Sequence, residues 1–173
     1  RLLQERLSPD KLLPLVLAEA VNRCQAQYGA IYWLDHRTSS FELVGFVGPD
    51  LLNERLPPTL GLTAHPLKRW ISSVNSTFVA RRAQDLPPPI VRSGPGETAW
   101  QLNSLAIVPL LGASGHFASI VLADERENAL DHTSIHTLEQ IARTSQTAIE
   151  QTWLYGKTDQ ELSRRLTEIS TLQ

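Results

Sequence analysis

Residues 104–125 read SLAIVPLLGASGHFASIVLADE, and this stretch decides the fold class. Two runs rich in apolar and β-branched residues, 104–112 and 116–125, flank the short segment Ala113–Gly115. Glycine and serine are favoured in tight turns, so the stretch predicts two antiparallel strands joined by a hairpin. Pro109 has no amide hydrogen for a sheet ladder, which predicts a bulge or an unpaired edge there.

The turn of this hairpin nearly matches a catalytic motif. Gly112 to His116 approximates the G-x-S-x-G nucleophile elbow, but that motif requires a turn from a strand into a helix. A hydrolase using His116 is therefore the weaker alternative, because no spaced nucleophile, base and oxyanion group accompany it. We predict no catalytic residue and expect this chain not to be an enzyme.

The flanking sequence predicts an α+β fold. Tyr28–Asp35 and Phe41–Gly48 alternate as a second hairpin, with Phe41, Leu43 and Val47 on one face, and Thr77–Arg81 is a short strand. Ser8 and Pro9 begin a helix, and helical periodicity runs from Asp131 to the last residue. Hairpins without alternating βα units predict an antiparallel sheet of about five or six strands, flanked by N- and C-terminal helices.

The totals limit the function classes. A chain of 173 residues with 42% hydrophobic and 20% charged residues is typical of one globular domain. The net charge of -2 argues against nucleic acid as a partner, and no apolar run is long enough to span a membrane. The single Cys24 allows no internal disulfide. We expect a cytoplasmic piece of a longer chain, without membrane contact.

Two stretches resemble a GAF domain, the small-molecule-sensing module of bacterial multidomain signalling proteins. LLPLVLAEAVNRCQAQYGAIYWLD (residues 12–35) is similar to the first helix and strand of this family. Residues 104–155 are similar to its end: a strand finishing in Val-Pro-Leu, a short turn, a strand leading to an acidic residue, and a closing helix. The resemblance implies a sensory domain over 9–155, an upstream connector helix ending in 1–8, and a downstream signalling helix starting in 156–173.

Departures from the family pattern narrow the ligand class. The phytochrome-like branch attaches a bilin through a cysteine beside the pocket, whereas Cys24 lies on the first helix, so covalent bilin is disfavoured and no cofactor is predicted. The cyclic-nucleotide signature has only displaced counterparts in Asn75, Phe78 and Asp124-Glu125. The free methionine sulfoxide reductase branch needs several cysteines, so its redox cycle cannot run here.

The candidate ligand pocket follows from this topology. An aromatic wall with a few charged groups suits a small organic or anionic ligand. Each of these residues could instead be core or solvated surface, which is the commoner role of aromatic and strand-end residues. The predicted pocket residues are Phe46, Trp70, Arg81, Asp85, Trp100 and Ile107. His132 and His136 share the spacing of two metal ligands on a helix, but no third ligand is evident, so no metal site is predicted.

The pattern of apolar residues in the last predicted helix indicates a dimer interface, which we call the seam. Its apolar residues recur with a heptad pattern that a parallel homodimer could bury, with small and polar members weakening it. An amphipathic helix covering its own sheet would explain residues 135–152 but not those from Leu162 onward. The seam and connector residues are Leu138, Ile141, Ala148, Leu162, Leu166 and Ile169.

These features predict a sensor that relays ligand binding through connector helices. By the family resemblance, the output domain is most simply a histidine kinase, with a diguanylate cyclase or a phosphatase as alternatives. The other class of function is a structural dimerisation module without a ligand.

Overall fold

The structure is a computed structural model, and it describes residues 9–37, 41–48, 59–60, 77–85 and 103–171. The elements along the chain are α1 (Pro9–Cys24), β1 (Tyr28–Leu34), β2 (Phe41–Val47), β3 (Thr59–Leu60), β4 (Phe78–Ala80), the short 3-10 helix η2 (Ala83–Asp85), β5 (Ser104–Gly112), β6 (Gly115–Asp124) and α3 (His132–Thr171).

The described strands form one antiparallel sheet. Its order is β3-β2-β1-β6-β5-β4, and each pair of neighbours is antiparallel. The predicted α+β class with an antiparallel sheet is therefore confirmed, including the hairpin that pairs Gly112 with Gly115. Pro109 is the register partner of Ser119 in β6 and lies beyond the three β5 residues that pair with β4, so its β4 side is unpaired among the described residues.

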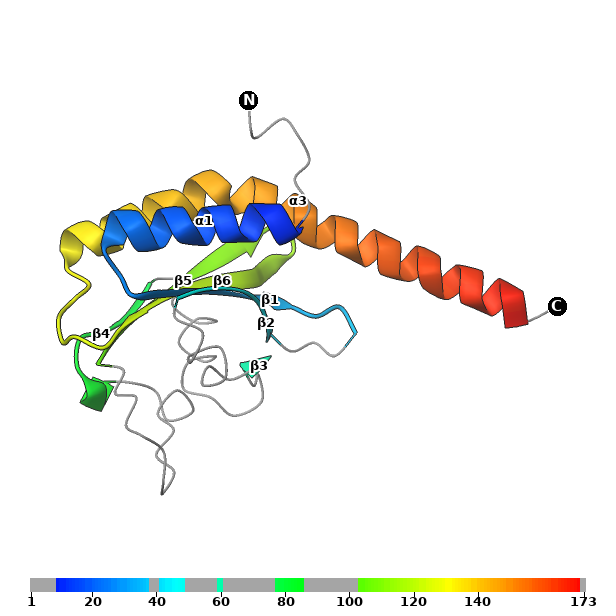
Figure 1. Ribbon diagram of the computed structural model, residues 1–173. Coiled ribbons are helices and arrows are strands. Elements are labelled where there is room, and N and C mark those ends of the chain that lie inside the picture. Colours follow the sequence, from blue (N-terminus) through cyan, green and yellow to red (C-terminus); the bar gives the residue numbers. More distant parts are fainter. Residues whose placement is uncertain (1–8, 38–40, 49–58, 61–76, 86–102, 172–173) are drawn as a thin grey trace, which may run out of the picture.

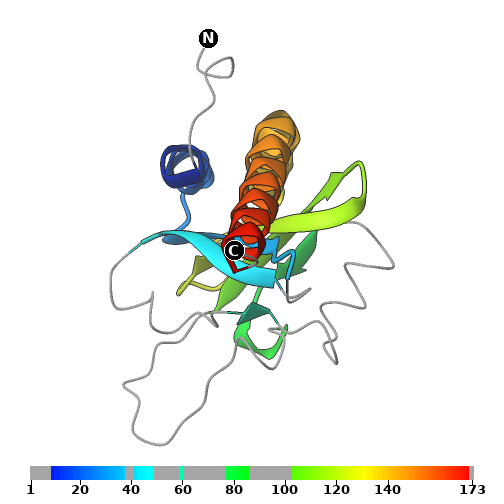
Figure 2. The same cartoon turned by 90° about the vertical axis from the view of Figure 1, so that its right-hand side faces the viewer.

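Both described α-helices pack on the same face of the sheet. Figure 1 shows α1 and α3 side by side above the strands, running in opposite directions, and Figure 2 views this arrangement along α3. The apolar stripe of α1, including Leu13 and Leu17, meets buried residues of α3 and of the central strands in one core. A side-chain Cβ at Gly29 would lie 2.8 Å from Val21 Cγ2, so the glycine allows α1 to approach β1 closely.

A β-bulge in β2 changes which of its residues face the helices. Ile31 pairs with Gly45 and Tyr32 pairs with Leu43, which leaves Val44 unpaired in β2. The bulge reverses the alternation, so Val47 packs against the helix-side core while Phe46 faces the other way. The prediction that Val47 shares a face with Phe41 and Leu43 is therefore wrong.

The start of α3 is fixed by its own cap and by α1. Asp131 Oδ1 accepts a hydrogen bond from the Ser134 amide at 2.8 Å, and this bond lowers the pKa of the Asp131 carboxyl. Cys24 and Ser134 exchange side-chain to backbone hydrogen bonds, each 3.3 Å long. Cys24 is buried, as predicted for a small apolar residue. No helix in the described ranges has the length and hydropathy needed to cross a bilayer.

Candidate functional site

The sheet face opposite α1 and α3 carries the candidate site. The strand registers align five side chains of this face in one row across the sheet: Phe46, Ala30, Val121, Ile107 and Phe78. Within the described residues no α-helix covers this face, yet Ile107 and Tyr32 are only 0% and 1% exposed. Ala30, the second residue of the row, has a smaller side chain than its neighbours Phe46 and Val121.

A second bulge brings a histidine to this face. In β6, Ala118 pairs with Leu110 and His116 pairs with Leu111, so Phe117 is unpaired. Phe117 and Ala118 both belong to the helix-side core, and His116 turns to the opposite face. There its ring stacks on Phe41, with the two centroids 4.5 Å apart.

Two polar groups of this face lie within hydrogen-bond distance of each other, beside a tyrosine. His116 Nε2 lies 2.8 Å from the buried Ser119 Oγ, within hydrogen-bond distance. Tyr32 pairs with Ser119 across β1 and β6, which places its ring on the same face. We call Tyr32, Phe41, His116 and Ser119 the polar-aromatic cluster.

Burial keeps this cluster uncharged at neutral pH. Desolvation lowers the pKa of His116 to about 4, and a hydrogen bond with the Ala118 backbone opposes the shift without cancelling it. Burial also raises the pKa of the Tyr32 phenol above its usual value. A molecule held here would meet a neutral imidazole and a protonated phenol, which suits hydrogen bonding and stacking rather than ion pairing.

The cluster is poorly arranged for nucleophilic catalysis. A reactive serine needs an accessible hydroxyl, and Ser119 is buried in the middle of a strand. Among the described residues no carboxylate contacts the His116 imidazole to orient it as a base. The Gly112–His116 turn joins two strands, so it is a hairpin and not a nucleophile elbow.

The structure describes four of the six predicted pocket residues. Phe46 and Ile107 lie in the same row of the candidate face. Arg81 follows β4 directly, with its carbonyl bonded to the Asn128 amide, and Asp85 is exposed at the end of η2. Trp70 and Trp100 lie outside the described residues. Sequence reasoning did not assign the polar-aromatic cluster to the pocket.

The predicted seam residues divide into two groups. Leu138 and Ile141 are buried in the chain's own core, and Ala148 packs partly against it. Leu138 and Ile141 cannot therefore meet a second copy while the domain is folded, because α3 uses them to cover the sheet. Leu162, Leu166 and Ile169 are 58%, 60% and 56% exposed, and their role in a dimer stays a prediction.

The acidic pair at the end of β6 has structural partners. The buried Asp124 carboxylate accepts hydrogen bonds from the Arg126 amide at 2.8 Å and from its guanidinium at 2.9 and 3.1 Å. Glu125 Oε1 accepts a hydrogen bond from the Tyr28 hydroxyl at 3.1 Å. These contacts fix the turn between β6 and α3. His132 and His136 are exposed on α3, and no group of three metal-ligating residues occurs in the part of the chain that the structure describes.

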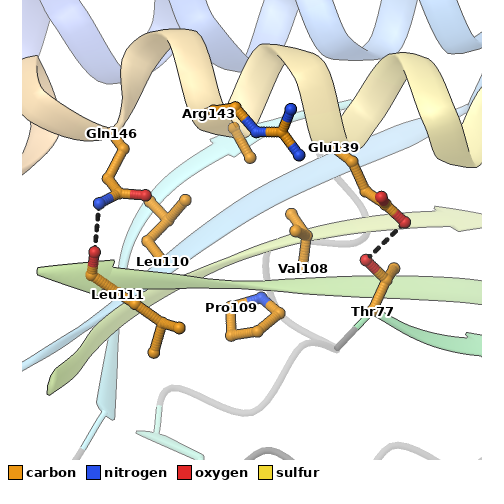
Figure 3. Close-up of a pocket in the computed structure, with 9 residues that line it drawn as sticks. Thr77, Val108, Pro109, Leu110, Leu111, Glu139, Arg143 and Gln146 are labelled. Atoms are coloured by element: carbon orange, nitrogen blue, oxygen red, sulfur yellow. Dashed lines mark hydrogen bonds between the residues drawn. The ribbon is translucent and has the colours of Figure 1, made fainter. Parts of the chain in front are cut away.

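A separate groove lies on the helix side, between α3 and β5 (Figure 3). Its volume is about 350 Å³, and Val108 and Leu110 point from β5 towards α3 to form its floor. Gln146 donates a hydrogen bond to the Leu111 carbonyl at one end, and Thr77 donates one to Glu139 at 3.0 Å at the other. The described members of the predicted pocket do not line this groove.

Comparison with solved structures identifies the fold. No protein-family model matches the sequence, and no curated protein matches it. The GAF domain of a phosphoenolpyruvate-protein phosphotransferase from Acinetobacter aligns over 88% of both chains, with 15% identity and a TM-score of 0.65. The GAF domain of a protein described as a sensor histidine kinase from Pseudomonas syringae pv. tomato aligns over 90% of this chain and 83% of its own, with 19% identity and a TM-score of 0.60.

An enzyme shares the same fold. The free methionine-R-sulfoxide reductase of Neisseria meningitidis, solved in complex with its substrate, aligns over 88% of this chain and 83% of its own, with 15% identity and a TM-score of 0.64. The chain therefore has the GAF fold, which occurs in signalling proteins and in at least one enzyme.

Proposed function

We propose that this chain is a sensory domain that binds a small molecule on the sheet face opposite α1 and α3 and relays binding through α3. The observation that carries the proposal is the division of α3 at Trp153. Before this residue the helix is part of the core, and after it Leu162, Leu166 and Ile169 expose an apolar stripe to water. An amphipathic helix that extends past its own domain is suited to contact another helix.

The partner that fits the exposed stripe is a second copy of this chain. Leu162, Leu166 and Ile169 follow a four-then-three spacing, which is the seam of a two-stranded coiled coil. A parallel homodimer would bury the stripe of each copy against the other. The signal is then a change in how the two α3 helices pack, and the output domain is a histidine kinase, by analogy with the Pseudomonas neighbour. A diguanylate cyclase or a phosphatase would use the same relay.

The candidate face supports a neutral or weakly polar ligand. Its described residues are apolar, aromatic or uncharged at neutral pH, and the polar-aromatic cluster supplies hydrogen-bonding groups at one end. This fits a noncovalent ligand, with no cofactor, metal or nucleic acid. We also propose that the chain is not itself an enzyme, since Ser119 is buried and the imidazole lacks a carboxylate partner among the described residues.

The second candidate is a dimerisation module with no ligand. The observation that favours it is the tight burial of Tyr32, Ile107 and Val121, which leaves these side chains little contact with water. In this case the face would be ordinary core, and α3 alone would carry the function.

Native mass spectrometry of the purified chain at several concentrations separates the two candidates. A dimer that carries the mass of a small molecule supports the sensor. A second sample with Ala30→Leu, which places a larger side chain between Phe46 and Val121 on the candidate face, should keep the dimer and lose the ligand. A dimer that never carries a ligand supports the dimerisation module, and a monomer at every concentration contradicts both. Leu166→Asp should abolish the dimer, whereas the control Thr167→Asp, on the next residue and outside the seam, should not.

A further inference from the structure

Among the α3 residues whose burial the structure describes, Trp153 is the last that is buried, and the end of the β1–β2 hairpin holds it. The indole Nε1 donates a hydrogen bond to the Leu34 carbonyl at 2.7 Å. His36 Nε2 lies 3.3 Å from the Trp153 carbonyl, to which it can only donate. The two rings stack with centroids 4.4 Å apart. The hairpin therefore fixes the backbone and the side chain of α3 at the point where the helix leaves the core.

The second bulge contacts the same tryptophan from the sheet. Phe117 stacks on Trp153 with ring centroids 5.0 Å apart. Phe117 is the unpaired residue of β6, and its neighbour His116 stacks on Phe41 on the opposite face. The same bulge thus contacts the candidate site through His116 and, through Phe117, the point at Trp153 where α3 leaves the core, which we call the exit of α3.

A second connection runs through the hairpin itself. Phe41, under the His116 ring, is the register partner of Leu34, whose carbonyl accepts the indole hydrogen bond. The His116 ring is thus connected, through Phe41 and its pairing with Leu34, to the strand end that holds Trp153. The contacts of Gln146 with Leu111 and of Glu150 with Ala113 also fasten α3, and Leu111 is the register partner of His116, so they hold α3 to the strand opposite the same bulge.

We propose that the His116–Phe117 bulge couples the candidate site to the exit of α3, with Trp153 as the residue that positions the connector helix. The inference rests on the proposed function in one respect, because a bound ligand is taken as the input. A ligand that separates His116 from Phe41 must rotate the bulge. The peptide that His116 shares with Phe117 then moves the Phe117 ring against Trp153, and α3 leaves the domain in a different direction. Packed aromatic contacts of this kind have discrete arrangements, so a small shift selects between them.

The direction of α3 can be measured without knowing the ligand. Spin labels on Asn22→Cys in α1 and Ser163→Cys in the distal part of α3, with Cys24→Ser to remove the native thiol, report one intramolecular distance by pulsed electron resonance. The labelled chain is diluted with excess unlabelled chain, so that distances between copies do not contribute. All further substitutions are compared with this labelled chain, and melting curves confirm that each variant is folded.

His116→Gln should shift or broaden the distance distribution, and Trp153→Phe, which removes the indole donor and keeps a ring, should do the same. Phe117→Leu provides a second test of the bulge if His116→Gln does not fold. The control is Val121→Ala, on the same face as His116 but away from Trp153, and it should reproduce the reference distribution. A distribution that responds to Trp153→Phe but to neither bulge substitution would overturn the proposal.

A double-mutant cycle tests the same coupling by urea unfolding. The effects of His116→Gln and Trp153→Phe on the unfolding equilibrium constant should depart from multiplicativity by at least about threefold, whereas Val121→Ala with Trp153→Phe should be multiplicative within about twofold. Multiplicative behaviour of the first pair would overturn the coupling.

The outcomes also separate the two proposals. A coupled bulge in a chain that never carries a ligand in native mass spectra would support this inference and contradict the sensor. A ligand-bearing dimer whose bulge variants leave α3 unmoved would support the sensor and overturn this inference.

Discussion

The two halves of α3 share one helix and one periodicity but differ in what surrounds them. In the proximal half, up to Trp153, Leu138, Ile141 and Ile149 are buried against α1 and the sheet. The distal half, from Leu154 to Thr171, has its described apolar residues at the surface. The same apolar spacing therefore serves a core in one half and an exposed stripe in the other, and only the neighbouring sheet distinguishes them.

This difference shows what helical periodicity can and cannot establish. A recurring apolar stripe predicts that one side of a helix packs against other residues, but it does not identify which residues cover it. For the proximal half the cover is the chain's own sheet. For the distal half we propose a second copy, and the following experiments test how far the two halves differ.

The largest expected difference comes from the same substitution in each half. Leu138→Ala removes a fully buried side chain and should lower the free energy of unfolding by about 2–5 kcal/mol. Leu162→Ala removes an exposed side chain and should change it by less than about 0.5 kcal/mol in the monomer. Urea denaturation at a concentration below dimerisation measures both. Equal losses would contradict the division at Trp153.

Acidification should lower the stability of the domain that the proximal half of α3 covers, and it should not affect the distal half. The pKa of His116 is lowered from 6.5 to about 4 by burial, so the folded state favours the neutral ring. As the pH falls, the His116 imidazole is protonated in the unfolded state at a higher pH than in the folded state. The free energy of unfolding is therefore at its full value above pH 6.5 and falls, by on the order of 1–3 kcal/mol, as the pH approaches 4.

The test of this acid effect is a pair of stability profiles. Unfolding free energies of the wild type and of His116→Gln are measured between pH 7 and pH 4. The wild-type profile should fall more steeply, because the variant has no imidazole to protonate. Parallel profiles would show that His116 is not responsible for the loss.

The contact between Glu150 in the proximal half of α3 and the β5–β6 hairpin depends on Gly112. A Cβ at Gly112 would lie 1.9 Å from Glu150 Oε2, so Gly112→Ala must displace the carboxylate that faces the Ala113 amide. We expect a loss of about 1–2 kcal/mol in unfolding free energy, because the flexible side chain relieves part of the clash. The double substitution with Glu150→Ala should recover part of the loss in thermal melting. A double variant as unstable as Gly112→Ala alone would show that the clash lies elsewhere.

The smallest effect is expected from the distal ion pair. Arg164 Nε and Glu168 Oε1 are 3.8 Å apart, and both side chains are well exposed. Glu168→Gln should change the unfolding free energy by less than about 0.5 kcal/mol. A loss comparable to that of Leu138→Ala would mean that the distal half is packed in solution, and size measurements would identify the contact.

The fold was predictable because most of its determinants are local. Alternation and turn residues placed the hairpins of β1–β2 and β5–β6, and the cap at Asp131 placed the start of α3. The two-residue strand β3 carried no recognisable signal. The orientation of Val47 was predicted wrongly because one unpaired residue, Val44, reverses the alternation, and nothing in the apolar pattern of 41–48 marks it.

The candidate site was less predictable for the same reason. Simple alternation from Val121 places His116 with the helix-side residues, and only the bulge at Phe117 turns it to the face that carries Ser119 and Phe41. Gly112 and Gly115, on either side of the turn, are compatible with a bulge in this hairpin, but they do not show at which residue it occurs. Phe46 and Ile107 were predicted as pocket residues; both lie on the candidate face, and their role in binding stays a prediction.

The length of α3 has a mechanical consequence. At 1.5 Å per residue, the segment from Trp153 to Thr171 is a rod of about 27 Å, so a tilt of about 10° at its base displaces its tip by about 5 Å. A rearrangement of a few tenths of an ångström among aromatic rings at the base is therefore enlarged severalfold at the far end. In the proposed relay, the contact between the β1–β2 hairpin and Trp153 is the point about which α3 tilts.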